Sequence, residues 1–148
     1  MRSRRGWSGA GLEYSNLFRA VRPGGPGRRV LIVEDEPWIA EMYAIGLQRD
    51  GWQVEIAPTA EEGLRQALST PPDLLLLDIM LPGMDGVEML SRLRSNPQTQ
   101  NLPVLVLSNS PGLSGKLQRA RSLGILGWLT KSSTTPRELA SEIRPFLK

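Results

Sequence analysis

The sequence predicts an α/β fold in which a parallel β-sheet carries helices on both faces. From residue 29 onward, short apolar runs alternate strictly with segments of helical periodicity. The run at residues 73–77, Asp-Leu-Leu-Leu-Leu, is apolar at successive positions, which is typical of a strand buried on both faces. Strict strand–helix alternation favours parallel pairing with helical crossovers.

Start and stop signals delimit the elements. Pro37 and Pro136 suit the first turns of helices. Thr59 and Glu62 have the spacing of a capping box, and Pro145 should distort the last turn of the final helix. The predicted elements, in chain order, are strand 30–33, helix 37–49, strand 53–57, helix 59–69, strand 73–77, helix 86–95, strand 103–107, helix 114–123, strand 126–129 and helix 135–147.

Right-handed crossovers leave few ways to arrange five parallel strands. We expect the flavodoxin-like, doubly wound five-stranded order 2-1-3-4-5, with helices on both faces. A ligand site in such a sheet lies past the carboxyl ends of strands 1 and 3, where the strand order reverses.

Composition excludes several classes of function. The chain has no cysteine and no histidine, so disulfides, thiolate metal sites and histidine-based catalysis are ruled out. No apolar run is long enough to span a bilayer, and polar residues interrupt any export signal at the start. A cytoplasmic location fits these features.

Residues 1–28 differ from the rest in charge and composition. Residues 1–29 carry seven arginines and one acid, whereas the remainder has a net charge of −3. The stretch Pro23-Gly24-Gly25-Pro26-Gly27 breaks regular structure. We predict a disordered basic extension at residues 1–28 and a globular domain at residues 29–148. The extension serves solubility in this interpretation, and nucleic-acid binding is not expected.

Carboxylates follow the two strands that border the predicted site. Glu34 and Asp35 come after strand 30–33, and Asp78 ends strand 73–77. Carboxylates that converge repel one another unless a hard cation lies among them, and Mg²⁺ prefers oxygen ligands of this kind. Ser108 and Lys131 follow the fourth and fifth strands at the same edge. A hydroxyl and an ammonium beside a carboxylate–metal site suit a transferred phosphoryl group.

Four segments closely resemble the CheY-like receiver domains of two-component response regulators. They are Val30-Leu-Ile-Val-Glu-Asp-Glu36, Leu75-Leu-Leu-Asp-Ile-Met-Leu-Pro-Gly-Met-Asp-Gly86, Val104-Leu-Val-Leu-Ser108 and Thr130-Lys131. The resemblance covers residues 29–148. It implies a phosphoacceptor that takes a phosphoryl group from a sensor histidine kinase or phosphotransfer protein, and not a turnover enzyme.

The resemblance also implies roles for single residues. Asp78 would be the phosphoacceptor. The Mg²⁺ ligands would be Asp35, Asp78 and the backbone carbonyl of Met80, with Glu34 acting through water. Lys131 and Ser108 would contact the phosphoryl group. Ser108 and Trp128 would form the switch, although simple packing of Trp128 on helix 114–123 is the alternative.

The chain departs from the family pattern beside two of these residues. Ser132 follows Lys131 where the family usually has proline, and we predict a trans peptide bond there. Asn109 follows Ser108 where a small residue is usual. A larger side chain at 109 would crowd the phosphoryl pocket or slow hydrolysis.

We therefore predict a single-domain response regulator that signals through protein contacts to an unknown target. The read-out face would be helix 114–123, strand 126–129 and helix 135–147, and a homodimer through it is one option. The alternative is a receiver-like interaction module that does not cycle phosphate, which the two departures motivate. A flavodoxin-type flavin binder is a weaker alternative, because acids stand where its phosphate loop would be.

Overall fold

A computed structural model describes residues 28–109 and 115–146. Its five strands form one parallel sheet in the order β2-β1-β3-β4-β5, which confirms the predicted flavodoxin-like topology. The elements are β1 (Arg29–Val33), α2 (Pro37–Arg49), β2 (Gln53–Ala57), α3 (Ala60–Ser69), β3 (Leu74–Leu77), α4 (Gly86–Arg94), β4 (Val104–Leu107), α5 (Lys116–Leu123), β5 (Gly127–Leu129), the 3-10 turn η2 (Lys131–Ser133), α6 (Pro136–Ile143) and the 3-10 turn η3 (Arg144–Phe146).

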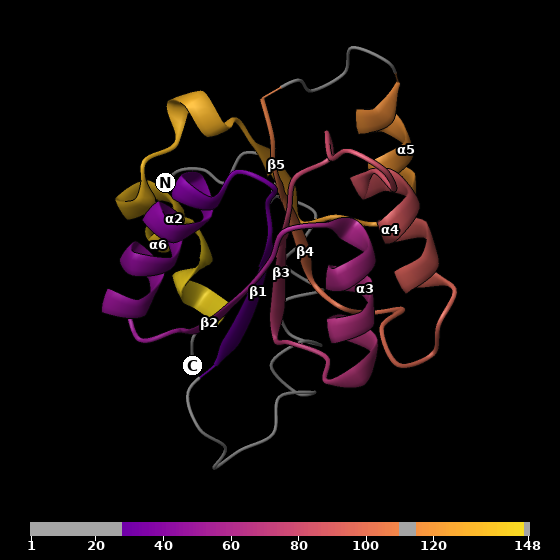
Figure 1. Cartoon of the computed structure of the whole chain (residues 1–148), viewed down its shortest axis with the longest axis horizontal. Coiled ribbons are helices and arrows are strands. Elements are labelled where there is room, and N and C mark those ends of the chain that lie inside the picture. Colours follow the sequence, from indigo (N-terminus) through magenta and orange to yellow (C-terminus); the bar gives the residue numbers. More distant parts are fainter. Residues whose placement is uncertain (1–27, 110–114, 147–148) are drawn as a thin grey trace.

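The helices cover the sheet from both sides. Figure 1 shows α2 and α6 on one face and α3, α4 and α5 on the other. Alternate strand residues feed two separate cores. Val30 and Ile32 pack in the core beneath α2 and α6, whereas Leu31 and Val33 pack in the core beneath α3, α4 and α5. Because both sets are buried, β3 and β4 read as unbroken apolar runs in the sequence, as does β1 after Arg29, whereas the edge strand β2 does not.

Helix ends mostly follow the predicted signals. The Thr59 hydroxyl accepts the backbone N–H of Glu62 at 3.1 Å, but the Glu62 carboxylate lies near Arg65 and does not complete a capping box. A complete capping box forms instead at Thr135 and Glu138, at the start of α6.

The last helix ends where proline was expected to disturb it. α6 stops at Ile143, and Pro145 lies in the 3-10 turn that follows. The peptide bond between Lys131 and Ser132 is trans, as predicted, and the described residues contain no cis bond.

The predicted extension, residues 1–28, lies outside the described residues except for Arg28. Within the described ranges no helix is long and apolar enough to cross a membrane.

Candidate functional site

The predicted site residues meet at one edge of the sheet. Glu34 and Asp35 follow β1, and Asp78 follows β3. Ser108 and Lys131 follow β4 and β5. β1 and β3 pair in parallel register through their last residues, so both chains end at the same level. The backbone extends this register by one step, because the N–H of Asp78 donates to the carbonyl of Val33 at 3.1 Å.

Three carboxylates converge there. Glu34, Asp35 and Asp78 each offer an oxygen, and these oxygens lie within 4.8 Å of one another. The side chains of Glu34 and Asp78 are buried, with 4% of each exposed, and Asp35 is more open to solvent. This is the convergence that the positions of the acids along the sequence predicted.

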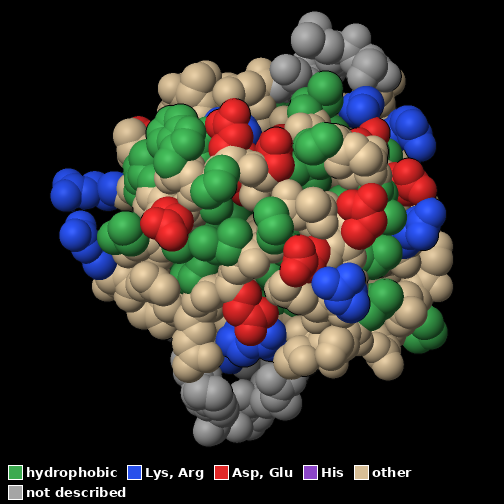
Figure 2. Space-filling model, in the orientation of Figure 1, with side chains coloured by type: hydrophobic (Ala, Val, Ile, Leu, Met, Phe, Trp, Pro, Cys, Tyr) green, Lys and Arg blue, Asp and Glu red, His purple; other side chains and the backbone are tan. Residues whose placement is uncertain are grey.

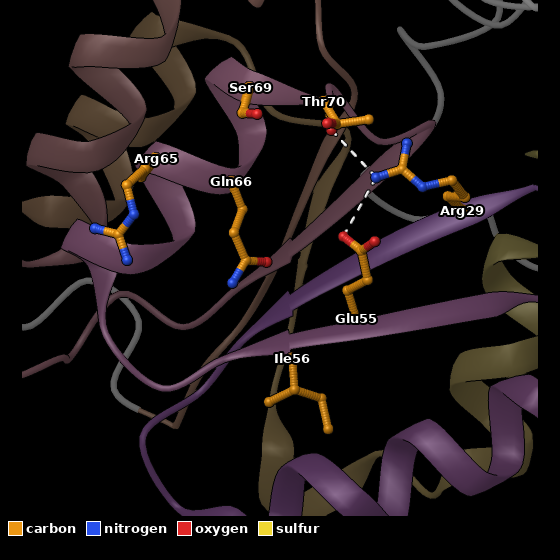
Figure 3. A pocket seen from close by; sticks show the side chains of 7 residues that line it. All are labelled: Arg29, Glu55, Ile56, Arg65, Gln66, Ser69 and Thr70. Atoms are coloured by element: carbon orange, nitrogen blue, oxygen red, sulfur yellow. Dashed lines mark hydrogen bonds and ion pairs between the residues drawn. The ribbon is translucent and has the colours of Figure 1, made fainter.

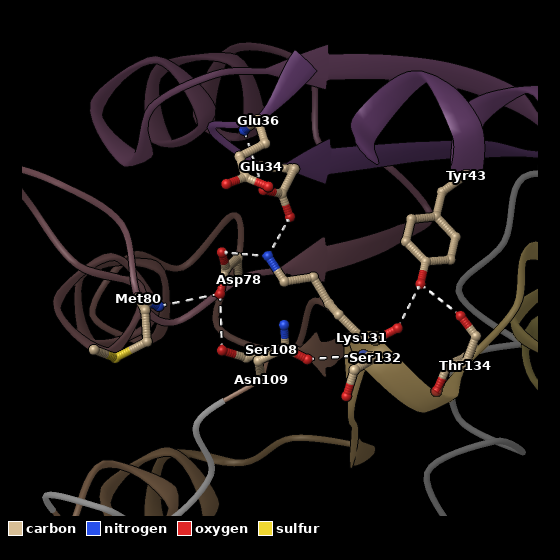
Figure 4. Close-up of polar contacts among 10 residues, drawn as sticks. All are labelled: Glu34, Glu36, Tyr43, Asp78, Met80, Ser108, Asn109, Lys131, Ser132 and Thr134. Carbon is tan, nitrogen blue, oxygen red and sulfur yellow. Dashed lines mark hydrogen bonds and ion pairs between the residues drawn. The ribbon is translucent and has the colours of Figure 1, made fainter. Parts of the chain in front are cut away.

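A single ammonium neutralises part of this charge. Lys131 Nζ lies 3.0 Å from Glu34 Oε1 and 3.1 Å from Asp78 Oδ2 (Figure 4). Burial on its own would lower the pKa of the Lys131 ammonium, but its hydrogen bond to Glu34 and the charge of Asp78 outweigh burial and hold the pKa above its ordinary value. Burial raises the pKa of Glu34, although Lys131 and the backbone N–H of Glu36 oppose that rise.

The other oxygen of Asp78 accepts two hydrogen bonds. Ser108 Oγ donates to Asp78 Oδ1 at 2.8 Å, and the backbone N–H of Met80 donates to the same atom at 3.1 Å. The Asp78 carboxylate is therefore oriented by Ser108, Met80 and Lys131. Ser108 and Lys131 were predicted to lie near Asp78 because each follows a strand, whereas the bond from the Met80 N–H was not predicted.

The donor set fits a hard divalent cation. Three carboxylates and one ammonium give a formal charge of −2 in a partly buried space. Carboxylate oxygens, in a chain that has no histidine and no cysteine, suit Mg²⁺ better than a transition metal. Glu34 makes a direct ion pair with Lys131, a contact that the sequence analysis did not predict.

Two contacts that support the site were also missed. The Tyr43 hydroxyl donates to the carbonyl of Thr134 at 2.6 Å and lies 3.4 Å from that of Lys131. The sequence analysis did not single out Tyr43. Asp85 caps α4 through the N–H of Glu88 at 2.9 Å and pairs with Lys116 at 2.7 Å. Asp85 directly precedes the predicted helix 86–95, and an aspartate at that position is a signal for this cap.

Gly86 allows the loop after Asp78 to fold back on itself. A Cβ at this position would lie 2.6 Å from the carbonyl oxygen of Asp78 and 2.7 Å from the Cα of Ile79. The N–H of Gly86 donates to the Ile79 carbonyl at 2.9 Å. The loop after Asp78 is thus closed by a close backbone approach that leaves no room for a Cβ at residue 86.

Trp128 packs against the core on the α5 side of the sheet and is partly buried. Its indole nitrogen is buried without a hydrogen-bond partner among the described residues. This buried cluster includes residues of α3, α4 and α5, and the switch role of Trp128 stays a prediction.

An open groove lies away from these residues. Its volume is about 700 Å³, and it is lined by residues from β1, β2 and α3 (Figure 3). Arg29 and Thr70 place it toward the amino ends of the strands, opposite Asp78. Figure 2 shows acidic side chains scattered over the upper, middle and lower parts of this face, so they do not form one continuous patch.

Comparison with known proteins agrees with this geometry. Residues 30–144 match the family described as the response regulator receiver domain. The chain is 34% identical over 120 residues to the DNA-binding dual master transcriptional regulator RpaA of Synechocystis sp., covering 81% of this chain and 49% of that protein. It is 33% identical over 122 residues to the phosphate regulon transcriptional regulatory protein PhoB of Pseudomonas aeruginosa, covering 82% and 52%.

Solved structures of receiver domains also resemble this chain. The chemotaxis response regulator CheY4 of Vibrio cholerae is 30% identical, with a TM-score of 0.72, over 81% of this chain and 98% of that one. A CheY-like receiver domain protein from Methanospirillum hungatei is 29% identical, with a TM-score of 0.73, over 79% and 90%. The chain belongs to the response regulator receiver domain family, whose members are phosphoacceptors and not turnover enzymes. It spans about half the length of the curated relatives named above.

Proposed function

We propose that this protein accepts a phosphoryl group on Asp78 in a Mg²⁺-dependent reaction. The donor is a phosphohistidine on a sensor kinase or phosphotransfer protein. The observation that supports this most directly is the cluster of three carboxylates within 4.8 Å, with Lys131 held against two of them. A carboxylate with a cation site on one side and an ammonium on the other suits in-line phosphoryl transfer.

Each residue has a distinct task in this proposal. Asp35, Asp78 and the backbone carbonyl of Met80 would hold Mg²⁺, and Glu34 would reach it through water. The bound ion supplies positive charge to the phosphoryl oxygens. Lys131 would exchange its contact with Asp78 Oδ2 for a phosphoryl oxygen, and the present distance of 3.1 Å makes that a short move.

Ser108 and Trp128 would act as the switch in this proposal. Ser108 Oγ now donates to Asp78 Oδ1 at 2.8 Å, and it would donate to a phosphoryl oxygen after transfer. That change would draw Ser108 and its neighbour Asn109 inward, and Trp128 would turn toward the space left behind. An added dianion orders loops in this way through new charge-assisted hydrogen bonds.

Two surfaces are available for partners in this proposal. α2 exposes Trp38, Met42 and Ile45 along one face, with 67%, 37% and 50% of each accessible. This spacing suits docking against a helix of the phosphoryl donor, close to Asp78. The signal would leave through α5, β5 and α6, to a protein target or to a second copy of the chain.

The wider setting is also a proposal. Residues 29–148 would act as the receiver domain in the cytoplasm, after a basic extension at residues 1–28. We propose output through protein contacts. The two relatives named above are transcriptional regulators by name, so a longer regulator that contains this domain is the second candidate.

Incubation with acetyl phosphate and Mg²⁺, followed by intact-mass measurement, tests the reaction. The protein should gain one phosphoryl group, and Asp78→Asn should gain none while keeping its circular dichroism spectrum. Asp50→Asn is the matched control, because Asp50 pairs with exposed Arg144 away from the site. A folded protein that binds Mg²⁺ but never gains mass would favour the interaction module that does not cycle phosphate.

A further inference from the structure

The two positions where this chain departs from the receiver pattern contact each other. The backbone N–H of Ser132 donates to Asn109 Oδ1 at 2.8 Å (Figure 4). Asn109 directly follows Ser108, and Ser132 directly follows Lys131. The bond therefore joins the two loops that carry the hydroxyl and the ammonium of the site.

This bond lies just past the end of the β4–β5 ladder. The N–H of Ser108 donates to the carbonyl of Leu129 at 3.0 Å, and the N–H of Lys131 lies 3.4 Å from the carbonyl of Ser108. Lys131 begins the 3-10 turn η2, where the strand pairing has ended. The bond from the Ser132 N–H to the Asn109 side chain is therefore an additional contact between the two segments, outside the ladder.

The same bond caps the 3-10 turn that contains Lys131. η2 begins after Thr130, which makes no side-chain cap. Its first N–H groups lack partners inside the turn, as at any helix start. Asn109 supplies an acceptor from the neighbouring loop, and Tyr43 holds the other end of η2 through the carbonyl of Thr134 at 2.6 Å.

We infer that Asn109 is a positioning residue for phosphoryl transfer, acting through the backbone N–H of Ser132. The inference rests on the proposed function and deepens it. The bond fixes the spacing between the Ser108 hydroxyl and the Lys131 ammonium before the phosphoryl group arrives. Donors that are already in place need no reorganisation during the reaction. The bond requires an N–H at residue 132, which proline lacks.

The expected effect is a modest loss of rate. One neutral, solvent-exposed hydrogen bond contributes at the low end of the usual range, so Asn109→Ala should slow phosphorylation by acetyl phosphate about two- to fivefold. Mg²⁺ affinity should stay the same, because the proposed ligands are untouched. Asn109→Leu keeps the side-chain size without an acceptor, and it should slow the reaction equally.

Measuring the effect of Asn109→Ala in the wild type, in Ser132→Ala and in Ser132→Pro tests whether the hydrogen bond causes the loss of rate. Asn109→Ala should have its full effect in the wild type and in Ser132→Ala, because both retain the backbone N–H. It should have none in Ser132→Pro, which removes the donor. In metal-free protein, the Ser132 amide should exchange with solvent faster in Asn109→Ala than in the wild type, which reports the bond independently of activity.

Other outcomes would overturn the inference. Crowding by Asn109 would make Asn109→Ala faster in every background and leave Asn109→Leu like the wild type. An equal effect of Asn109→Ala in Ser132→Ala and Ser132→Pro, or an unchanged Ser132 exchange rate, would exclude the bond as the cause. If Ser132→Pro does not fold, the exchange rate of the Ser132 amide and the phosphorylation rate of Asn109→Leu still test the inference. Failure of the proposed function is separate, because the wild type would then gain no mass.

Discussion

Lys131→Met should sharply destabilise the protein in the absence of divalent cations. The Lys131 ammonium contacts Glu34 and Asp78 at 3.0 and 3.1 Å, and 11% of its side chain is exposed. At an effective dielectric constant of about 20, each contact is worth about 5 kcal/mol of attraction, most of which is offset by the cost of burying the charges. Removing one member of a buried group leaves the others uncompensated and costs about 3 kcal/mol or more.

Lys116→Met is the matched control. Lys116 pairs with Asp85 at 2.7 Å, but 24% and 30% of the two side chains are exposed. Loss of a pair this open to solvent should cost about 1 kcal/mol or less. Urea unfolding of the wild type and both variants in EDTA measures the difference. Equal losses for the two variants would refute the reasoning.

Magnesium and pH should each reduce the cost of Lys131→Met. Saturating Mg²⁺ stabilises whatever form binds it, and the variant has lost the ammonium that competes for Glu34 and Asp78. Burial raises the pKa of Glu34, so this carboxylate binds a proton more readily folded than unfolded. The loss should therefore shrink as the pH falls and Glu34 becomes neutral. A loss that is constant with pH would contradict this account.

Three further predictions concern Asp78 and the loop that follows it. Asp78→Asn should abolish the mass gain with acetyl phosphate while leaving the thermal unfolding transition in place. Gly86→Ala should destabilise by about 2 kcal/mol in urea unfolding, because the new Cβ meets backbone atoms at 2.6 and 2.7 Å; a neutral result would show that the loop moves freely. Burial alone would raise the pKa of Asp85, but its hydrogen bonds from Lys116 and from backbone N–H groups lower the pKa below its ordinary value. Ionised Asp85 therefore stabilises the folded protein at neutral pH, and this stability is lost as the pH falls through the folded pKa. Asp85→Asn retains a capping side chain, so its stability should approach that of the wild type below about pH 4, and a constant gap would contradict the assignment.

Local sequence signals located the site because of a property of parallel sheets. All strands in such a sheet run the same way, so residues that follow different strands meet at one edge. Glu34, Asp78 and Lys131 lie far apart in the chain, yet each follows a strand. Recognising the strands was enough to bring them together.

Side-chain partners were harder to predict. The Thr59–Glu62 spacing suggested a capping box, but Glu62 turned toward Arg65, whereas Thr135 and Glu138 formed one. Both pairs have suitable residues at suitable spacing. Which long side chain folds back depends on the charges and solvent around it, and these come from the tertiary structure.

The sequence by itself determined the element order, the parallel sheet and the edge at which the acids gather. Apolar periodicity is a local property, and the alternation of strands with helices favours parallel pairing. Only the tertiary structure decided that Lys131 pairs with Glu34 as well as Asp78, and that Asn109 accepts the N–H of Ser132. These contacts join loops from different strands, and their geometry depends on distances of a few tenths of an ångström that packing sets.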